Sequence, residues 1–241
     1  MSAAMVLLTG AAAACSAGGW AATSRTLRRR TAELAHQQHD GLTGLWRREG
    51  FEHHAPAALA TGNAIALLDL DGFKQVNDTF GHATGDEVLR VTAARLTAEL
   101  GESALIARLG GDEFALIAGL DFPAVHDQLD ALSAALRAPL VVPGAGELAV
   151  GASLGVAWLC DLPVFDTDRA HRRTERFWAD VLSEGLSAAD AAMYAAKALC
   201  HDWQLFDRAV DPVRPAAAIT PAPKRRYREH GATALTALTH P

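Results

Sequence analysis

Apolar residues in the middle of the chain recur either at helical spacing or in short runs of strand-forming residues. Ala64–Leu70 is a continuous apolar run, which is typical of a buried strand. Thr84–Leu100 repeats its apolar residues every three to four positions, which predicts an amphipathic helix. The same patterns predict helices over 48–60, Ala124–Ala138 and Ala188–Ala198, and strands over Leu148–Leu159 and Trp203–Phe206.

A hairpin lies at the centre of this pattern. Leu105–Leu109 and Phe114–Ala118 are two strand-like runs, and only Gly-Gly-Asp-Glu separates them, which predicts a tight turn. Helices and strands alternate on both sides of the hairpin. We therefore predict an α+β domain with a mixed central sheet flanked by helices.

The two ends of the chain differ from the middle. Residues 2–24 carry no charged side chain and are long enough to span a bilayer. The arginines that follow, Arg25 and Arg28 to Arg30, would keep the downstream domain in the cytoplasm. This N-terminal segment is so rich in Ala and Gly that a weak anchor or a disordered start is the alternative. Residues 25–39 are expected to form a linker helix that sets dimerisation.

Two further stretches fall outside the alternating pattern. Residues 160–185 are charged and longer than an ordinary connection, which predicts an insertion with a helix of its own. Residues 211–241 combine five prolines with many alanines, and we expect a disordered tail there. The catalytic domain is therefore predicted to span residues 40–210.

Composition and charge narrow the classes of function. The 241 residues suffice for one well-packed domain with short appendages. A formal net charge of −6 lacks the basic surface of a duplex-binding protein, so nucleic acid is not an expected partner. The three cysteines, Cys15, Cys160 and Cys200, are widely spaced and form no pair suited to zinc.

Acidic residues end one predicted strand and lie at the tip of the hairpin. Asp69 and Asp71 follow an apolar run, where ionised carboxylates are costly unless they are solvated or bind a cation. Asp112 and Glu113 lie in the turn and can approach that strand end. Such carboxylates form an oxygen site that suits Mg²⁺. The alternative is a set of solvated turn acids.

The segment after Asp71 adds groups that could bind a nucleotide. Residues 72–86 offer loop backbone N–H groups, Lys74 for phosphate and polar side chains before a helix. An asparagine and an aspartate in this segment can hydrogen-bond the edge of a guanine base. Lys197, at the end of a predicted helix, is a second cation for a triphosphate.

Seven motifs in this order resemble those of the GGDEF-domain diguanylate cyclases. They are Asp40–Leu45 (DGLTGL), Asp69–Lys74 (DLDGFK), Asn77–His82 (NDTFGH), Gly85-Asp86, Arg108–Phe114 (RLGGDEF), Ser153–Ala157 (SLGVA) and Ala189–Lys197 (ADAAMYAAK). The resemblance covers residues 40–206. It implies a palm-like fold related to the adenylyl cyclase and polymerase palm, with the Gly-Gly-Asp-Glu-Phe motif on a β-hairpin.

The resemblance also implies a reaction and a metal site. Two GTP molecules would condense to cyclic di-GMP and two pyrophosphates, across a homodimer in which each domain holds one GTP. Asp69 and Asp112 would hold Mg²⁺ or Mn²⁺ with help from the Leu70 carbonyl. Glu113 would bind the metal or help to deprotonate the attacking 3′-hydroxyl.

Further roles are implied at the substrate. Lys74, counted among the catalytic residues, would neutralise phosphate charge together with Lys197. Gly110 and Gly111 would let the α-phosphate approach their backbone closely. Guanine recognition would fall to Asn77 and Asp86, with Phe73 beside them in the substrate site.

The chain departs from the family pattern at two places. The family usually continues from Lys197 to Gly-Arg-Asn, with the arginine on the terminal phosphates, but Cys200, His201 and Asp202 occupy these positions. A regulatory domain that binds GTP without turnover is therefore the alternative to an active cyclase. Gly101–Ala104 replaces the Arg-x-x-Asp motif that binds product, which argues against feedback inhibition and against a cyclic di-GMP receptor.

Overall fold

The computed structural model describes residues 38–142, 146–166 and 174–209. The chain divides into two compact units, Met1–His39 and Asp40–Pro241, and the fold below is that of the second. The predicted membrane segment 1–24 and tail 211–241 lie outside the described residues, as does the predicted linker helix apart from residues 38 and 39. None of the helices in the described part of the chain has the length and apolar character needed to cross a membrane.

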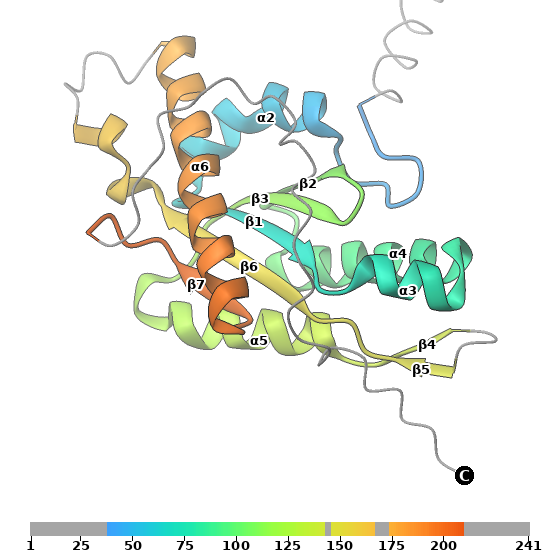
Figure 1. The fold of residues 1–241 in the computed structure, drawn as a ribbon. Helices are drawn as coiled ribbons and strands as arrows, with labels where there is room; N and C mark the ends of the chain where they lie inside the picture. Colours follow the sequence, from blue (N-terminus) through green and yellow to red (C-terminus); the bar gives the residue numbers. More distant parts are fainter. Residues whose placement is uncertain (1–37, 143–145, 167–173, 210–241) are drawn as a thin grey trace, which may run out of the picture. The chain divides into compact units, whose positions relative to one another are not determined.

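The core of the domain is a five-stranded sheet (Figure 1). Its strands lie in the order β2-β3-β1-β6-β7, and all neighbours are antiparallel except β6 and β7, which are parallel. The strands are β1 (Ala64–Leu70), β2 (Leu105–Gly110), β3 (Glu113–Ala118), β6 (Ala152–Trp158) and β7 (Trp203–Leu205). The predicted mixed sheet with flanking helices is confirmed.

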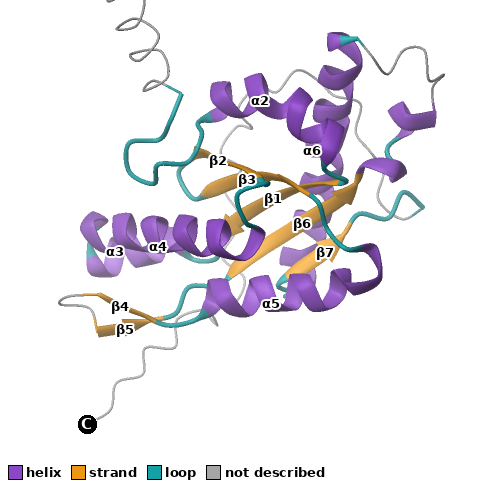
Figure 2. Cartoon of the chain, turned by 180° about the vertical axis from the view of Figure 1, so that it is seen from behind, coloured by secondary structure: helices purple, strands orange, loops and turns teal. Residues whose placement is uncertain are grey.

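Helices cover both faces of the sheet, as the view from behind shows (Figure 2). Ala64, Ala66, Leu68 and Leu70 of β1 belong to the same buried cluster as apolar residues of α4 (His82–Leu100) and α5 (Val125–Arg137). Ile65 belongs instead to the cluster formed with α2 (Arg48–Thr61) and α6 (Glu175–Leu199). The alternation follows from the two-residue period of a strand, and it explains why β1 is apolar on both faces.

Two glycines let α6 pack closely on the sheet. A Cβ atom at Gly155 of β6 would overlap the backbone O of Ala189 and the backbone N of Met193. A Cβ atom at Gly185 of α6 would overlap the Cδ1 atom of Ile65. Because the missing side chains let helix and strand approach, the C-terminal end of α6 is held at the sheet.

The prediction of two separate helices around position 185 was wrong. The expected helix of the 160–185 insertion and the expected helix Ala188–Ala198 are one 25-residue helix, α6. The predicted insertion ended at Gly185, but the helix continues through this position. Close packing against Ile65 explains the glycine. The stretch before α6 contains the short 3₁₀ helices η2 (Leu159–Asp161) and η3 (Pro163–Asp166).

Other boundaries also differ from the prediction. The segment expected to offer loop backbone before the predicted helix at Thr84 contains α3 (Phe73–Phe80), and α4 begins at His82. The strand predicted over Leu148–Leu159 is divided, because β5 (Gly146–Leu148) pairs with β4 (Leu140–Val142) in a small separate sheet. A third 3₁₀ helix, η1 (Phe122–Ala124), precedes α5.

Candidate active site

Acidic residues from neighbouring strands meet at the end of β1. Asp69, the last residue but one of this strand, pairs with Glu113 of β3 on one side and with Ser153 of β6 on the other. The Leu70 N–H donates a hydrogen bond to the Asp112 carbonyl (3.3 Å), which ties the hairpin turn to the end of β1. The carboxylates of Asp69, Asp112 and Glu113 are therefore held at one end of the sheet.

The turn is shorter than the sequence suggested. The prediction placed Glu113 in the turn, but β2 extends to Gly110 and β3 begins at Glu113, so only Gly111 and Asp112 lie between the strands. A β-bulge interrupts the pairing between Arg108 and Gly110. Gly110 (φ +151°) and Gly111 (φ +57°) have backbone angles that other residues rarely adopt. The glycines thus shape the bulge and the turn, and they leave the space beside their backbone open.

Burial and neighbouring carboxylates raise the pKa values of Asp112 and Glu113. Partial burial raises the pKa of Asp112, and the negative charge of Asp69 raises it further. Glu113 shows the same pattern, since partial burial, Asp69 and Asp112 all raise its pKa. Lys197 of α6 provides a counter-charge, with its Nζ atom 2.7 Å from Asp69 Oδ1. Excess negative charge therefore accumulates at the turn, and a cation would relieve it.

The donor atoms available here suit Mg²⁺ or Mn²⁺. These ions prefer oxygen ligands, and Mg²⁺ is usually bound by one or two carboxylates together with substrate phosphates and water. The described residues contain no group of three or more side chains already arranged as a complete metal site. Among the described residues, the Asp69 and Asp112 carboxylates and the Leu70 carbonyl are candidate ligands, and the remaining ligands of such an ion would come from outside the protein.

The predicted base-binding residues lie on two neighbouring helices, α3 and α4. Asn77 lies on α3, and Asp86 lies near the start of α4. A Cβ atom at Gly85 would overlap Asn77 Oδ1 and would lie 3.2 Å from Phe73 Cζ. Asn77 therefore lies directly against the helix turn that carries Asp86. Phe73 is buried beneath them, whereas Lys74 is exposed on α3.

A family model described as "Diguanylate cyclase, GGDEF domain" matches residues 37–165. The chain belongs to the GGDEF-domain family. An uncharacterized 19.3 kDa protein of Streptomyces ambofaciens is 42% identical over 186 residues, which cover 74% of this chain and 87% of that protein. The diguanylate cyclase TpbB of Pseudomonas aeruginosa (strain PAO1) is 35% identical over 69% of this chain. This chain spans 37% of that cyclase.

Solved structures agree with this assignment. The coiled coil and GGDEF domain of DgcB from Caulobacter crescentus, solved in complex with c-di-GMP, superposes with a TM-score of 0.61 at 26% identity. The match covers 78% of this chain and 95% of the DgcB chain. The palm-like fold expected from the motifs is therefore confirmed.

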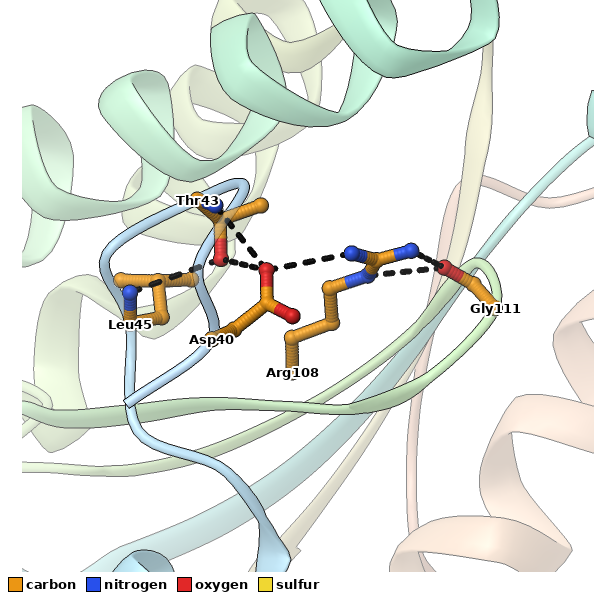
Figure 3. Close-up of polar contacts among 5 residues, drawn as sticks. All are labelled: Asp40, Thr43, Leu45, Arg108 and Gly111. Atoms are coloured by element: carbon orange, nitrogen blue, oxygen red, sulfur yellow. Dashed lines mark hydrogen bonds and ion pairs between the residues drawn. The ribbon is translucent and has the colours of Figure 1, made fainter. Parts of the chain in front are cut away.

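In this GGDEF domain the side chain of Arg108 is hydrogen-bonded to the turn at Gly111 (Figure 3). Nε and Nη2 of Arg108 both donate to the Gly111 carbonyl, at 2.9 and 2.7 Å. Its Nη1 atom bonds Asp40 Oδ1 at 3.1 Å. Asp40 Oδ1 also accepts hydrogen bonds from the Thr43 N–H (2.9 Å) and hydroxyl (2.8 Å).

This network links the start of the domain to the acidic turn. The hydrogen bonds from Thr43 and Arg108 lower the pKa of Asp40, although burial, the largest single effect, raises it. Sequence reasoning placed Arg108, Asp40 and Thr43 in motifs but assigned them no role. The position of Arg108 next to the glycine turn was a signal in the sequence for a role at the turn. Its pairing with Asp40, 68 residues earlier in the chain, left no such signal.

Asp71 turns out to be anchored by the backbone and by a serine. The Asp71 N–H donates to the Gly151 carbonyl (2.9 Å), and Ser153 Oγ donates to Asp71 Oδ1 (2.8 Å). Burial raises the pKa of Asp71, while Ser153, Lys197 and, more weakly, Arg137 lower it. Sequence reasoning grouped Asp71 with Asp69 and did not find its partner Ser153.

The end of α6 is where the chain departs from the family motif in sequence. Cys200 caps the helix with a left-handed backbone (φ +56°), where the family has glycine. His201 is exposed, and Asp202 forms an ion pair with Arg137 of α5. A cation from another helix is therefore present at this end of the site.

Proposed function

We propose that this GGDEF domain is a diguanylate cyclase, which condenses two GTP molecules into cyclic di-GMP and two pyrophosphates. The observation that carries the proposal is the meeting of Asp69, Asp112 and Glu113 at one end of the sheet, beside Lys197. Excess negative charge at this point suits a divalent cation and the phosphates that accompany it.

The acidic residues are assigned separate tasks. Asp69 and Asp112, together with the Leu70 carbonyl, hold Mg²⁺ or Mn²⁺, which supplies charge neutralisation at the reacting phosphate when bound. Glu113 is the candidate base for the attacking hydroxyl. Its raised pKa supports this role, because a general base works best when its pKa approaches the working pH.

The chemical step is an in-line displacement at phosphorus. The 3′-oxygen of one GTP forms a bond to the α-phosphorus of the other, and the bond from that phosphorus to the bridging oxygen of the β-phosphate breaks. The hydroxyl proton passes to Glu113, and pyrophosphate carries away the bonding electrons. A second displacement in the opposite sense closes the ring, which accounts for two pyrophosphates per product.

Substrate contacts are assigned from positions around the acidic turn. Lys74 and Lys197 offset phosphate charge, and the open backbone at Gly110 and Gly111 lets the α-phosphate approach. Asn77 of α3, which lies against Gly85, and Asp86, the next residue of α4, bind the guanine edge, with Phe73 in the wall of the site.

The reaction requires two copies of the domain. Each site holds one GTP, so two domains must face each other before either hydroxyl reaches the other α-phosphate. We therefore propose a homodimer for the active state. GTP supply places the catalytic domain in the cytoplasm, and tethering to the inner face of the cell membrane through residues 2–24 stays a prediction.

A second function is favoured by one observation. His201 occupies the position where the family motif has an arginine for the terminal phosphates. Weaker contact with these phosphates would leave a domain that binds GTP and regulates other proteins without turnover.

The deciding experiment incubates the full chain with GTP and Mg²⁺ and resolves the products. An active cyclase forms cyclic di-GMP and releases two pyrophosphates for each molecule made. Asp112→Asn should abolish turnover, and Asp127→Asn, an exposed change on α5, should not. Wild-type product at or below the Asp112→Asn level would refute the cyclase, and GTP binding without product would establish the second function.

A further inference from the structure

A pocket of about 640 Å³ lies beyond Lys197, where α5, the end of α6 and β7 meet. Its lining includes Arg137, His201, Asp202 and Trp203. None of these residues has a task in the proposed reaction. Trp203 Nε1 donates to Asp130 Oδ1 (2.7 Å), and this bond joins β7 to α5 across the pocket wall.

Backbone contacts place this pocket next to the acidic site. The Leu154 N–H donates to the Asp202 carbonyl (2.9 Å), and the preceding residue, Ser153, pairs with Asp69. Neighbouring strands lie about 4.8 Å apart, so Asp202 lies roughly two strand spacings from Asp69. Lys197, which forms the ion pair with Asp69, lies in the last turn of α6, and Cys200 caps the helix directly before His201 and Asp202.

Arg137 is the permanent positive charge in this pocket lining. Its guanidinium forms an ion pair with Asp202, and both side chains reach solvent, with 52% and 33% exposed. An ion pair with this exposure contributes little to stability. A phosphate group carries more charge than a carboxylate and accepts both arms of the guanidinium, so it can displace Asp202.

We propose that Arg137 binds the terminal phosphates of the bound nucleotide after leaving Asp202. This inference rests on the proposed function, because it takes GTP as the ligand of the acidic site. The α-phosphate lies at the Gly110 and Gly111 turn, Lys197 follows, and Arg137 completes a row of cations toward β7. Asp202 thereby competes with the substrate for Arg137.

Two variants should shift GTP binding in opposite directions. Arg137→Ala removes the phosphate contact, and we expect the Kd for GTP with Mg²⁺ to rise about tenfold, the effect of one charge-assisted hydrogen bond. Asp202→Asn keeps the backbone bond to Leu154 but releases the guanidinium, so the Kd should fall roughly threefold. GMP lacks the terminal phosphates, and its Kd should stay unchanged in both variants.

The matched control is Arg176→Ala. Arg176 is exposed in the first turn of α6, about 35 Å along the helix from Cys200, and its removal should leave both Kd values unchanged. If Arg137 merely held β7 in place through Asp202, both site variants would weaken binding, and GMP would be affected as much as GTP.

The results separate this inference from the cyclase proposal. A wild-type enzyme that makes cyclic di-GMP, with an Arg137→Ala Kd for GTP within twofold of wild type, would overturn the inference alone. If the wild-type protein binds GTP but makes no product, and Arg137→Ala binds GTP more weakly, the inference is supported and the cyclase proposal is overturned. Absence of GTP binding to wild type would overturn both.

Discussion

Replacing Gly85 with alanine should damage substrate binding without unfolding the domain. The new Cβ atom would overlap Asn77 Oδ1 and lie 2.9 Å from Asn77 Cγ. Since Asn77 is a flexible side chain, it can rotate away. The rotation costs about 0.5–1.5 kcal/mol if it strains the rotamer, and alanine returns about 0.5–1 kcal/mol in the helix interior. The free energy of unfolding should therefore change by less than about 1 kcal/mol.

The effect on nucleotide binding should be larger. On the proposed role of Asn77 in binding the base, moving its side chain removes one or two hydrogen bonds, each with a net contribution of about 0.5–1.5 kcal/mol. A total of about 1–2 kcal/mol corresponds to a roughly 5- to 30-fold rise in the Kd for GTP. Calorimetric titration with GTP and GMP measures this directly. Both nucleotides should lose affinity alike, because the contact is with the base.

Two further variants of the protein serve as controls for this experiment. Gly119→Ala is the matched control, because nothing lies within 4 Å of its added Cβ atom. In the double variant of Gly85→Ala and Asn77→Ala, the Kd for GTP should equal that of Asn77→Ala alone, since the glycine change acts through Asn77. Gly85→Ala with wild-type affinity and stability would show that Asn77 makes no contact with the base.

Three other changes test the remaining structure. Asp112→Asn should abolish turnover yet raise Tm slightly at neutral pH. The raised pKa of Asp112 means that folding favours its protonated form, so the ionised carboxylate destabilises the folded state. The gain in Tm should therefore vanish as the pH falls through the pKa of Asp112. Gly155→Ala should lower stability by about 2 kcal/mol or more in thermal unfolding, because the overlapping Ala189 and Met193 atoms are backbone and cannot rotate away. Arg108→Lys should lower turnover at least about tenfold, with unchanged product identity, since lysine cannot span Gly111 and Asp40 together; wild-type turnover would contradict this role.

Local pattern was sufficient for much of the sheet. The bounds predicted for Ala64–Leu70 agree with β1, and the hairpin and the helix over 48–60 were placed within a few residues. These elements have a clear period or distinctive turn residues, so neighbours along the chain determine them. Predictions failed where a residue served a distant contact, as Gly185 does against Ile65.

The sequence by itself determined the family, the fold class and the acidic residues, because motif order and strand period are properties of neighbouring positions. Only the tertiary structure decided the partners of Arg108 and Arg137, which lie at Asp40 and Asp202. It also placed Glu113 opposite Asp69 rather than in the turn. Side chains that meet from distant segments leave no spacing signal, since folding alone brings them together.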